Sequence, residues 1–290
     1  MSLHQLHTLH NRSFDGAKFV YPVLSRRSGG MSVGVNLNPD KVCNFDCIYC
    51  QVDRRVHSET RFVGMELLLA ELREMLTLVA TGKIYETEAF RSTPPALRRL
   101  NDIAFSGDGE PTTYKNFDAI IQACAGAKRD AGLDEVKMVL ITNASMFHRK
   151  HVERGLKILD ANQGEIWAKL DAGTDAYYHL IERTPIPFQQ ILDNITAAAK
   201  VRPLVIQSLW MRVNDEPPPT AELAAYCERL KEILAAGGNL SLVQVYTVAR
   251  RPAESSVTPL TRAEVDAIAQ MVRQRVGVAT ACYYGSGGGW

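Results

Sequence analysis

The sequence lacks a long hydrophobic run. None of its stretches approaches the roughly 18 consecutive apolar residues that a membrane-spanning helix needs. Its first residues, MSLHQLHTLHNRSFDGAKF, contain no apolar signal-peptide core. Charge of one sign is also scarce, because 33 basic and 32 acidic residues leave a net charge of +1. A nucleic-acid partner is therefore possible but not indicated by charge. These absences predict a cytoplasmic protein with no membrane partner.

Cysteines are few and unevenly placed. Of the six, none precedes Cys43, and three are isolated along the chain: Cys124, Cys227 and Cys282. Single cysteines of this kind commonly pack in a core. The other three, Cys43, Cys47 and Cys50, lie within the ten residues VCNFDCIYCQ. In a reducing compartment such close spacing indicates metal binding or redox chemistry rather than disulfides.

Three thiolates form an incomplete ligand set. Four would close a structural zinc site or a fully ligated iron–sulfur cluster. With three, one iron of a 4Fe–4S cluster has no protein ligand and can bind a small molecule. A zinc ion held by the same cysteines and His57 is an alternative, and so is an iron–sulfur protein for electron transfer or redox sensing.

Strand-like and helix-like segments alternate along the chain. Hydrophobic residues make up 46% of the sequence, enough for a full core. The pattern predicts six strands, over residues 30–37, 101–107, 135–143, 164–171, 203–213 and 240–249. Predicted helices lie between and after them, over 64–82, 116–131, 144–159, about 172–200, 219–236 and 261–276. Strict alternation predicts an α/β fold with a parallel sheet and helices outside, open or partly closed as a barrel.

The alternation shows no linker, so we expect a single domain over residues 1–290 with its core at about 20–275. Residues 83–100 are expected to be an insertion, and the glycine-rich residues 284–290 a flexible tail. In parallel sheets the chemistry gathers in the loops after the strands. The cysteine loop and the segments GDGEP, TNAS and KLDAGT all occupy such positions.

The pattern C-x-x-x-C-x-aromatic-C in CNFDCIYC, following the first predicted strand, resembles the radical S-adenosylmethionine (SAM) superfamily. The resemblance implies a partial (β/α)6 barrel and a 4Fe–4S cluster on Cys43, Cys47 and Cys50. In that superfamily SAM chelates the remaining iron, and one electron cleaves it to methionine and a 5′-deoxyadenosyl radical that abstracts hydrogen. An electron donor such as a flavodoxin or ferredoxin is then expected as a partner.

The resemblance also implies residues for binding SAM. SGDGEPT resembles the glycine-rich GGE-type motif of the family, in which glycines let the backbone approach the ligand; its members here are Gly107, Asp108, Gly109, Glu110 and Pro111. Glu110 is expected to accept from the SAM ammonium, whereas Asp108 replaces the second glycine of the motif.

The resemblance implies further positions. It places Tyr49, in the cysteine loop, at the adenine, and Thr142 and Asn143, at the end of the third predicted strand, near the ribose or methionine. Lys169 and Asp171 are predicted to be catalytic, with Lys169 and Gln207 also contacting cofactor or substrate.

Longer patches, including VNLNPDKVCNFDCIYCQVDR and AKLDAGTDAYYHLIER, resemble the group that contains the wyosine-forming enzymes of tRNA. Those enzymes hold a second cluster on extra N-terminal cysteines, and this sequence has no cysteine before Cys43. The resemblance therefore does not imply the wyosine reaction itself, and the expected substrate is a small metabolite, a peptide or a tRNA base.

Overall fold

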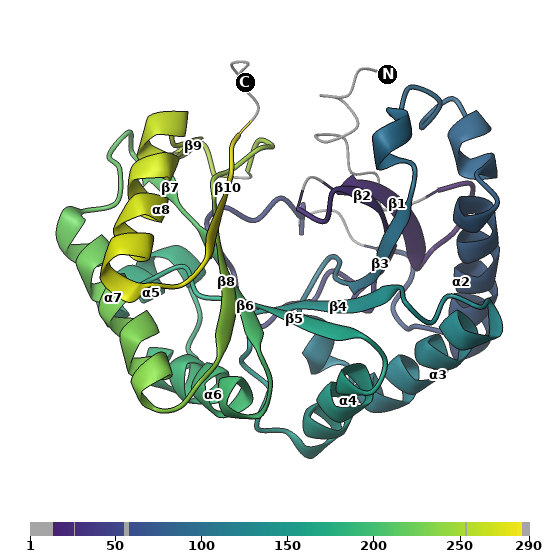
Figure 1. Ribbon diagram of the computed structural model, residues 1–290, viewed down its shortest axis with the longest axis horizontal. Coiled ribbons are helices and arrows are strands. Elements are labelled where there is room, and N and C mark those ends of the chain that lie inside the picture. The colour runs from purple at the N-terminus through teal and green to yellow at the C-terminus, as the bar shows by residue number, and fades with distance from the viewer. Residues whose placement is uncertain (1–13, 26, 55–57, 253, 286–290) are drawn as a thin grey trace. The chain divides into compact units, whose positions relative to one another are not determined.

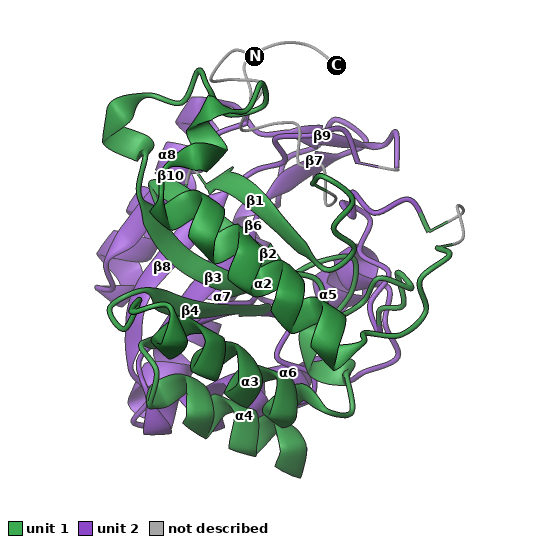
Figure 2. Cartoon of the chain, turned by 90° about the vertical axis from the view of Figure 1, so that its right-hand side faces the viewer, with its two compact units in different colours: residues 1–43, 54–141, 149–165 green, residues 44–53, 142–148, 166–290 purple. Residues whose placement is uncertain are grey.

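The chain divides into two compact units in the computed structural model, which describes residues 14–25, 27–54, 58–252 and 254–285 (Figures 1 and 2). Unit 1 comprises Met1–Cys43, Arg54–Ile141 and Arg149–Glu165, and unit 2 comprises Asn44–Asp53, Thr142–His148 and Ile166–Trp290. The single domain over residues 1–290 stays a prediction. His57 and residues 286–290 of the predicted tail lie outside the described residues.

Unit 1 contains four neighbouring strands, in the order β1 (Val20–Ser25), β2 (Gly30–Val35), β3 (Leu100–Phe105) and β4 (Lys137–Thr142). The last residue of β4, Thr142, belongs to unit 2. Strands β2, β3 and β4 are parallel, as predicted, whereas β1 was not predicted and pairs antiparallel with β2.

Strand β1 is held in place by the Glu71 carboxylate. Its two oxygens accept from the backbone N–H groups of Lys18, Phe19 and Val20 at 2.8–3.1 Å. Pro22 interrupts this short apolar segment, which is why it did not stand out as a strand. Proline is tolerated here because β1 is an edge strand of the sheet.

Three helices lie along one side of the strands of unit 1 (Figure 1). These are α2 (Met65–Ala80), α3 (Phe117–Asp130) and α4 (Lys150–Asp160). The predicted insertion at 83–100 contains two 3₁₀ helices, η1 (Lys83–Glu86) and η2 (Pro95–Leu97). The predicted helix 144–159 begins later, at Lys150, because Ala144 has a positive φ of 59°, which ends regular structure after β4.

Unit 2 contains a second run of parallel strands, in the order β5 (Gly164–Lys169), β6 (Leu204–Leu209), β8 (Leu240–Tyr246) and β10 (Thr280–Tyr283). The first two residues of β5 belong to unit 1. The predicted strand 203–213 is divided at Trp210, and its second part, β7 (Met211–Val213), pairs antiparallel with β9 (Val257–Pro259). Strand β10 was not predicted, and the predicted tail begins directly after it.

The helices of unit 2 are α5 (Asp175–Glu182), α6 (Phe188–Val201), α7 (Thr220–Ala235) and α8 (Arg262–Val276). Helix α7 faces one side of the strands, because Ser208 Oγ on β6 lies 2.5 Å from Tyr226 Oη on α7. Since side chains alternate along a strand, Gln207 points to the opposite side. The predicted alternation of six strands with helices is confirmed. None of the described helices combines the length and apolar character that crossing a membrane requires.

Candidate active site

The three clustered cysteines lie in the irregular segment between β2 and α2. Cys43, Cys47 and Cys50 form no disulfide and are half-buried. Among the residues that the structure describes, no three His, Cys, Asp or Glu side chains are gathered as a metal site. The metal-ligand set therefore stays a prediction from spacing. Cys124 on α3 and Cys227 on α7 are buried, and Cys282 is on β10.

Within unit 2 the end of α5 anchors the cysteine loop. The backbone N–H of Asp46 donates to the Glu182 carbonyl at 3.0 Å, and that of Ile48 donates to the Ile181 carbonyl at 2.9 Å. Ile48 and Tyr49 are buried in one hydrophobic cluster with Ile181. Both residues between Cys47 and Cys50 are thereby fixed in the interior of unit 2.

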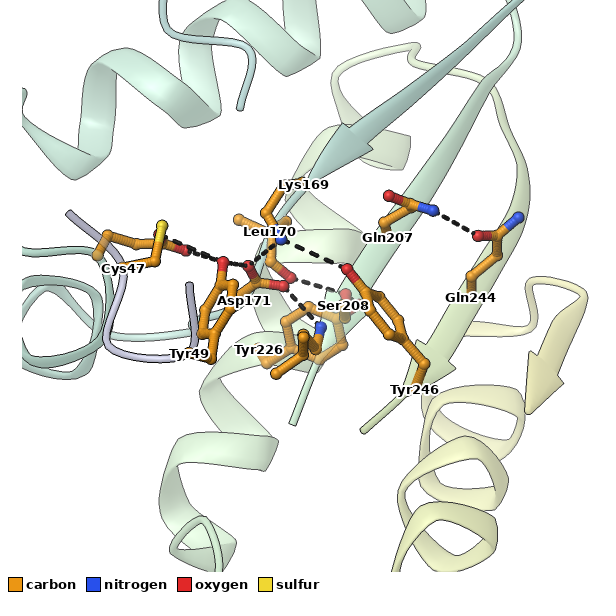
Figure 3. A network of polar contacts seen from close by, with 12 residues as sticks. Cys47, Tyr49, Lys169, Leu170, Asp171, Gln207, Ser208, Tyr226, Gln244 and Tyr246 are labelled. Carbon is orange, nitrogen blue, oxygen red and sulfur yellow. Dashed lines mark hydrogen bonds and ion pairs between the residues drawn. The ribbon is translucent and has the colours of Figure 1, made fainter. Parts of the chain in front are cut away.

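Tyr49 connects this loop to the end of β5 (Figure 3). Its hydroxyl donates to Asp171 Oδ2 at 2.5 Å and lies 3.2 Å from Glu182 Oε1. Lys169 Nζ lies 3.0 Å from the same Asp171 oxygen and 4.7 Å from the centre of the Tyr49 ring. The Cys47 thiol donates to Glu182 Oε2 at 2.6 Å. The two predicted catalytic residues, Lys169 and Asp171, are thus brought together with Tyr49.

Asp171 is the centre of this network. Its side chain has no solvent exposure, whereas 18% of the Lys169 side chain is exposed. Asp171 Oδ1 accepts from the Leu209 backbone N–H at 2.6 Å, so both carboxylate oxygens are used. Lys169 Nζ also lies 3.4 Å from the Tyr246 hydroxyl.

Burial dominates the titration of these groups. Desolvation raises the pKa of the Cys47 thiol and of the Tyr49 phenol well above their usual values, and negative neighbours add to it. Desolvation, followed by the Asp171 charge, raises the pKa of Glu182 to about 8. For Lys169 desolvation lowers the pKa, but the surrounding acids outweigh it and the pKa lies above the usual value. Lys169 is therefore an ammonium at neutral pH.

The predicted glycine motif follows β3 in unit 1. A Cβ added to Gly107 would lie 2.2 Å from Asn36 Oδ1, and one added to Gly109 would lie 2.1 Å from the Val42 carbonyl oxygen. Only glycine fits at these two positions. Asp108, which departs from the GGE-type pattern, is held by Asn36, whose Nδ2 donates to Asp108 Oδ2 at 2.7 Å.

Glu110 is buried and caps the short helix η3 (Pro111–Thr113), whose first residue is Pro111. Its Oε1 accepts from the Thr112 backbone N–H at 3.1 Å and from the Thr112 hydroxyl at 2.5 Å. The carboxylate that was predicted to receive the SAM ammonium is thus fixed in orientation by its own loop.

Thr142 and Asn143 shape the turn after β4. The Thr142 hydroxyl accepts from the Ala144 backbone N–H at 3.0 Å. Asn143 Oδ1 accepts from the Ser145 hydroxyl at 2.6 Å, and its Nδ2 donates to Asn44 Oδ1 in the cysteine loop at 2.9 Å. Both predicted residues have structural roles here, and their contact with SAM stays a prediction.

Gln207 is fully buried on β6. It lies between Lys169 on β5 and Gln244 on β8, which are its partners in register. Its Nε2 donates to Gln244 Oε1 at 2.8 Å (Figure 3).

Sequence reasoning missed Glu182, Gln244 and Asn36. Glu182 lies in the last turn of α5 and is 3% exposed, so it is a buried acid on an otherwise amphipathic helix. A charged residue on the apolar face of a predicted helix was the available signal. Nothing in the local sequence connects it to Cys47.

One family model covers more than half of the chain. The family model of the radical SAM superfamily matches residues 37–224. One curated relative is a UPF0026 protein of Helicobacter pylori, which is 27% identical over 77% of this chain and 65% of its own length. Another is a protein named GTPase Obg of Brachyspira hyodysenteriae, which is 23% identical over 84% of this chain and 32% of its own length. The chain thus spans about a third to two thirds of the length of the curated relatives it matches.

Two solved structures are similar in fold. A radical SAM methyltransferase from Sphaerobacter thermophilus gives a TM-score of 0.63 at 15% identity, covering 96% of this chain and 72% of that one. A structure of TYW1 with a lysine-pyruvate adduct bound gives a TM-score of 0.50 at 14% identity and covers 90% of this chain and 85% of that one. These likenesses confirm the predicted fold class, the α/β partial barrel of the radical SAM type.

Proposed function

Because the chain belongs to the radical SAM superfamily and is an enzyme of that superfamily, we propose that it holds a 4Fe–4S cluster on Cys43, Cys47 and Cys50 and binds SAM. The observation that carries the proposal is the three-cysteine spacing inside the matched region, residues 37–224. When bound, the reduced cluster supplies the electron that cleaves SAM to methionine and a 5′-deoxyadenosyl radical, which abstracts hydrogen from the substrate.

The donor set fits such a cluster. Three cysteines that form no disulfide occur in one irregular loop between β2 and α2. Thiolates are the protein ligands of 4Fe–4S clusters, and three of them leave one iron for a small molecule. Tyr49 and Ile48 are buried between the last two cysteines and hold that part of the loop against α5.

The residues of unit 1 support SAM binding through their backbone. Gly107 and Gly109 keep the loop after β3 free of side chains, so peptide groups can approach a ligand closely. Glu110, oriented by Thr112, presents a buried carboxylate that suits an ammonium group. In unit 2 the roles proposed for Lys169 and Asp171 are to bind and orient the substrate, because Asp171 fixes the position of the Lys169 ammonium.

The partners follow from the chemistry. The cluster requires a one-electron donor such as a flavodoxin or ferredoxin. The substrate is a small metabolite, a peptide or a tRNA base.

The test is anaerobic. The chain is reconstituted with iron and sulfide, reduced with dithionite and mixed with SAM, and 5′-deoxyadenosine is measured by mass spectrometry. We expect it to form in the wild type and to be absent, together with the brown cluster, after Cys43→Ala, Cys47→Ala or Cys50→Ala. Cys282→Ala is the matched control, because this half-buried thiol lies on β10 and should not affect iron content.

Two outcomes would refute the proposal. A brown protein that leaves SAM intact under all reducing conditions favours the iron–sulfur protein for electron transfer or redox sensing. A colourless protein that retains zinc instead of iron favours the zinc site.

A further inference from the structure

A polar row crosses three neighbouring strands of unit 2. Lys169 on β5, Gln207 on β6 and Gln244 on β8 are partners in register, so they point to the same face of the strands. That face is the one opposite α7, since Ser208 points to α7. Gln207 is 0% and Gln244 2% exposed.

Such a row is not what a core requires. Parallel strands that are buried on both faces usually carry Val, Ile and Leu. The residues one row earlier on this face, Trp167 and Val205, are apolar and buried, as expected. Burying two carboxamides and an ammonium instead costs free energy unless every polar atom has a partner.

One of these atoms has no partner. Gln207 uses its Nε2 to donate to Gln244 Oε1 at 2.8 Å. Its Oε1 is buried, and none of the described residues donates to it. The oxygen lies at the end of the amide away from Gln244, on the side of Lys169 (Figure 3). A buried acceptor without a donor is energetically unfavourable, which indicates that a ligand supplies the donor.

Lys169 offers the complementary group. An ammonium has three N–H donors. Its oxygen partners among the described residues are Asp171 at 3.0 Å and the Tyr246 hydroxyl at 3.4 Å, which leaves a third donor direction. Because the Asp171 carboxylate already balances the charge of Lys169, a neutral carbonyl oxygen suits this donor better than a second carboxylate.

A donor and an acceptor on adjacent strands define the shape of the ligand. Neighbouring strands lie about 4.8 Å apart, so Lys169 and Gln207 approach a ligand from the same side. An amide can meet both only if its C=O and N–H point the same way. Lactam rings and primary carboxamides have an N–H on the same side as the C=O, whereas an open-chain secondary amide is trans.

We propose that Lys169, Gln207 and Gln244 form the substrate-binding surface of unit 2 and bind a lactam or a primary carboxamide. Its carbonyl oxygen accepts from Lys169 and its N–H donates to Gln207 Oε1, while Gln244 holds the Gln207 amide in this orientation. The inference rests on the proposed function, because it names the substrate class of that enzyme.

The experiment is saturation-transfer NMR on the full chain, with 2-pyrrolidone and acetamide as the two cis probes. Cyclopentanone lacks the N–H, N-methylacetamide is trans, and propionate is an anion. We expect at least one cis probe to bind about 5-fold more tightly than cyclopentanone, the value of one hydrogen bond of about 1 kcal/mol, and more tightly than N-methylacetamide and propionate. Whether 2-pyrrolidone or acetamide binds better distinguishes a ring lactam from a primary carboxamide.

Variants assign the contacts. Gln207→Leu should abolish the preference for 2-pyrrolidone over cyclopentanone, while Gln207→Glu, which keeps an acceptor oxygen, should retain it. Lys169→Met should weaken the binding of 2-pyrrolidone and of cyclopentanone. Gln189→Leu, on the exposed surface of α6, is the matched control and should change neither.

Stronger binding of propionate, or an unchanged preference in a folded Gln207→Leu variant, would overturn the inference. The probes need neither iron nor SAM. Failure of probe binding in a protein that forms 5′-deoxyadenosine overturns this inference alone. Probe binding in a protein that never acquires a cluster refutes the proposed function alone.

Discussion

Replacing Asp171 with Asn tests whether the Lys169–Asp171 pair is the centre of unit 2's polar network. The change keeps the size of the side chain and the acceptor for the Leu209 backbone N–H, now 2.6 Å away. It removes the negative charge and places an amide N–H₂ where a carboxylate oxygen accepted from Tyr49 at 2.5 Å and paired with Lys169 at 3.0 Å. The ammonium of Lys169 then faces a donor instead of an anion.

The expected cost follows from burial. Breaking a fully buried ion pair by removing one partner costs about 3–5 kcal/mol. Asp171 is fully buried, but 18% of the Lys169 side chain remains exposed, and water there compensates part of the lost charge. We therefore expect Asp171→Asn to lower the free energy of unfolding by about 2–3 kcal/mol.

Urea unfolding followed by circular dichroism measures this difference. The matched control is Asp175→Asn, because the Asp175 side chain is 71% exposed and lies 3.5 Å from His179. Asp175→Asn should lower the free energy of unfolding by less than about 0.5 kcal/mol. Repeating Asp171→Asn in a Lys169→Met background should cost at least about 1 kcal/mol less, since the ammonium is then gone. Equal costs for Asp171→Asn and Asp175→Asn, or no coupling to Lys169, would refute the reasoning.

Three further predictions concern unit 1. Glu110→Ala removes the cap of a short helix, so we expect a weaker affinity for SAM with the cluster intact, measured by calorimetry; unchanged affinity would remove Glu110 from the site. Gly109→Ala places a Cβ 2.1 Å from the Val42 carbonyl oxygen and should abolish SAM binding or folding, whereas Gly126→Ala has nothing within 4 Å and, being in a helix, should stabilise by up to about 1 kcal/mol. Lys128→Met leaves three carbonyls without the ammonium that now contacts them at 2.7–3.1 Å, so urea unfolding should show a loss of at least about 2 kcal/mol, and an unchanged midpoint would contradict this.

The sequence was sufficient to predict the elements that carry a strong local signal. The six apolar runs of the parallel strands became β2, β3, β4, β5, β6 and β8. Residues at the ends of these strands, such as Lys169 and Asp171, could be predicted as site residues because catalytic and binding residues of parallel sheets lie at the carboxyl ends of the strands. Strand β1 could not be found in this way, since its position depends on Glu71, which is about 50 residues away in sequence.

The contacts within the site depend on tertiary register. Glu182 meets Cys47 across 135 residues of sequence, and nothing local to either residue specifies the other. Gln207 stood out as a polar residue in a strand, but its meaning depends on Gln244, which becomes its neighbour only through the pairing of β6 with β8. Sequence therefore identified single residues, while the pairs that give them a role came from the fold.

The Gln207–Gln244 pair leads to a prediction in which stability and function oppose each other. If the pair served only to stabilise unit 2, replacing both residues with apolar ones would be destabilising. The buried Gln207 Oε1 argues the opposite, because an acceptor without a donor is a cost in the ligand-free protein. Natural proteins retain such costs where function requires them.

The double variant Gln207→Leu/Gln244→Leu replaces each glutamine with a side chain of similar volume. We expect it to raise the free energy of unfolding by about 1 kcal/mol, because both carboxamides, including the acceptor without a donor, are removed together. Gln207→Leu alone should be less stable than the double variant, since it leaves Gln244 Oε1 without the donor that now lies 2.8 Å away. Urea midpoints of the three proteins measure this order. A double variant less stable than either the wild type or the single variant would show that the pair is structural, and the case for a ligand at Gln207 would lose its physical basis.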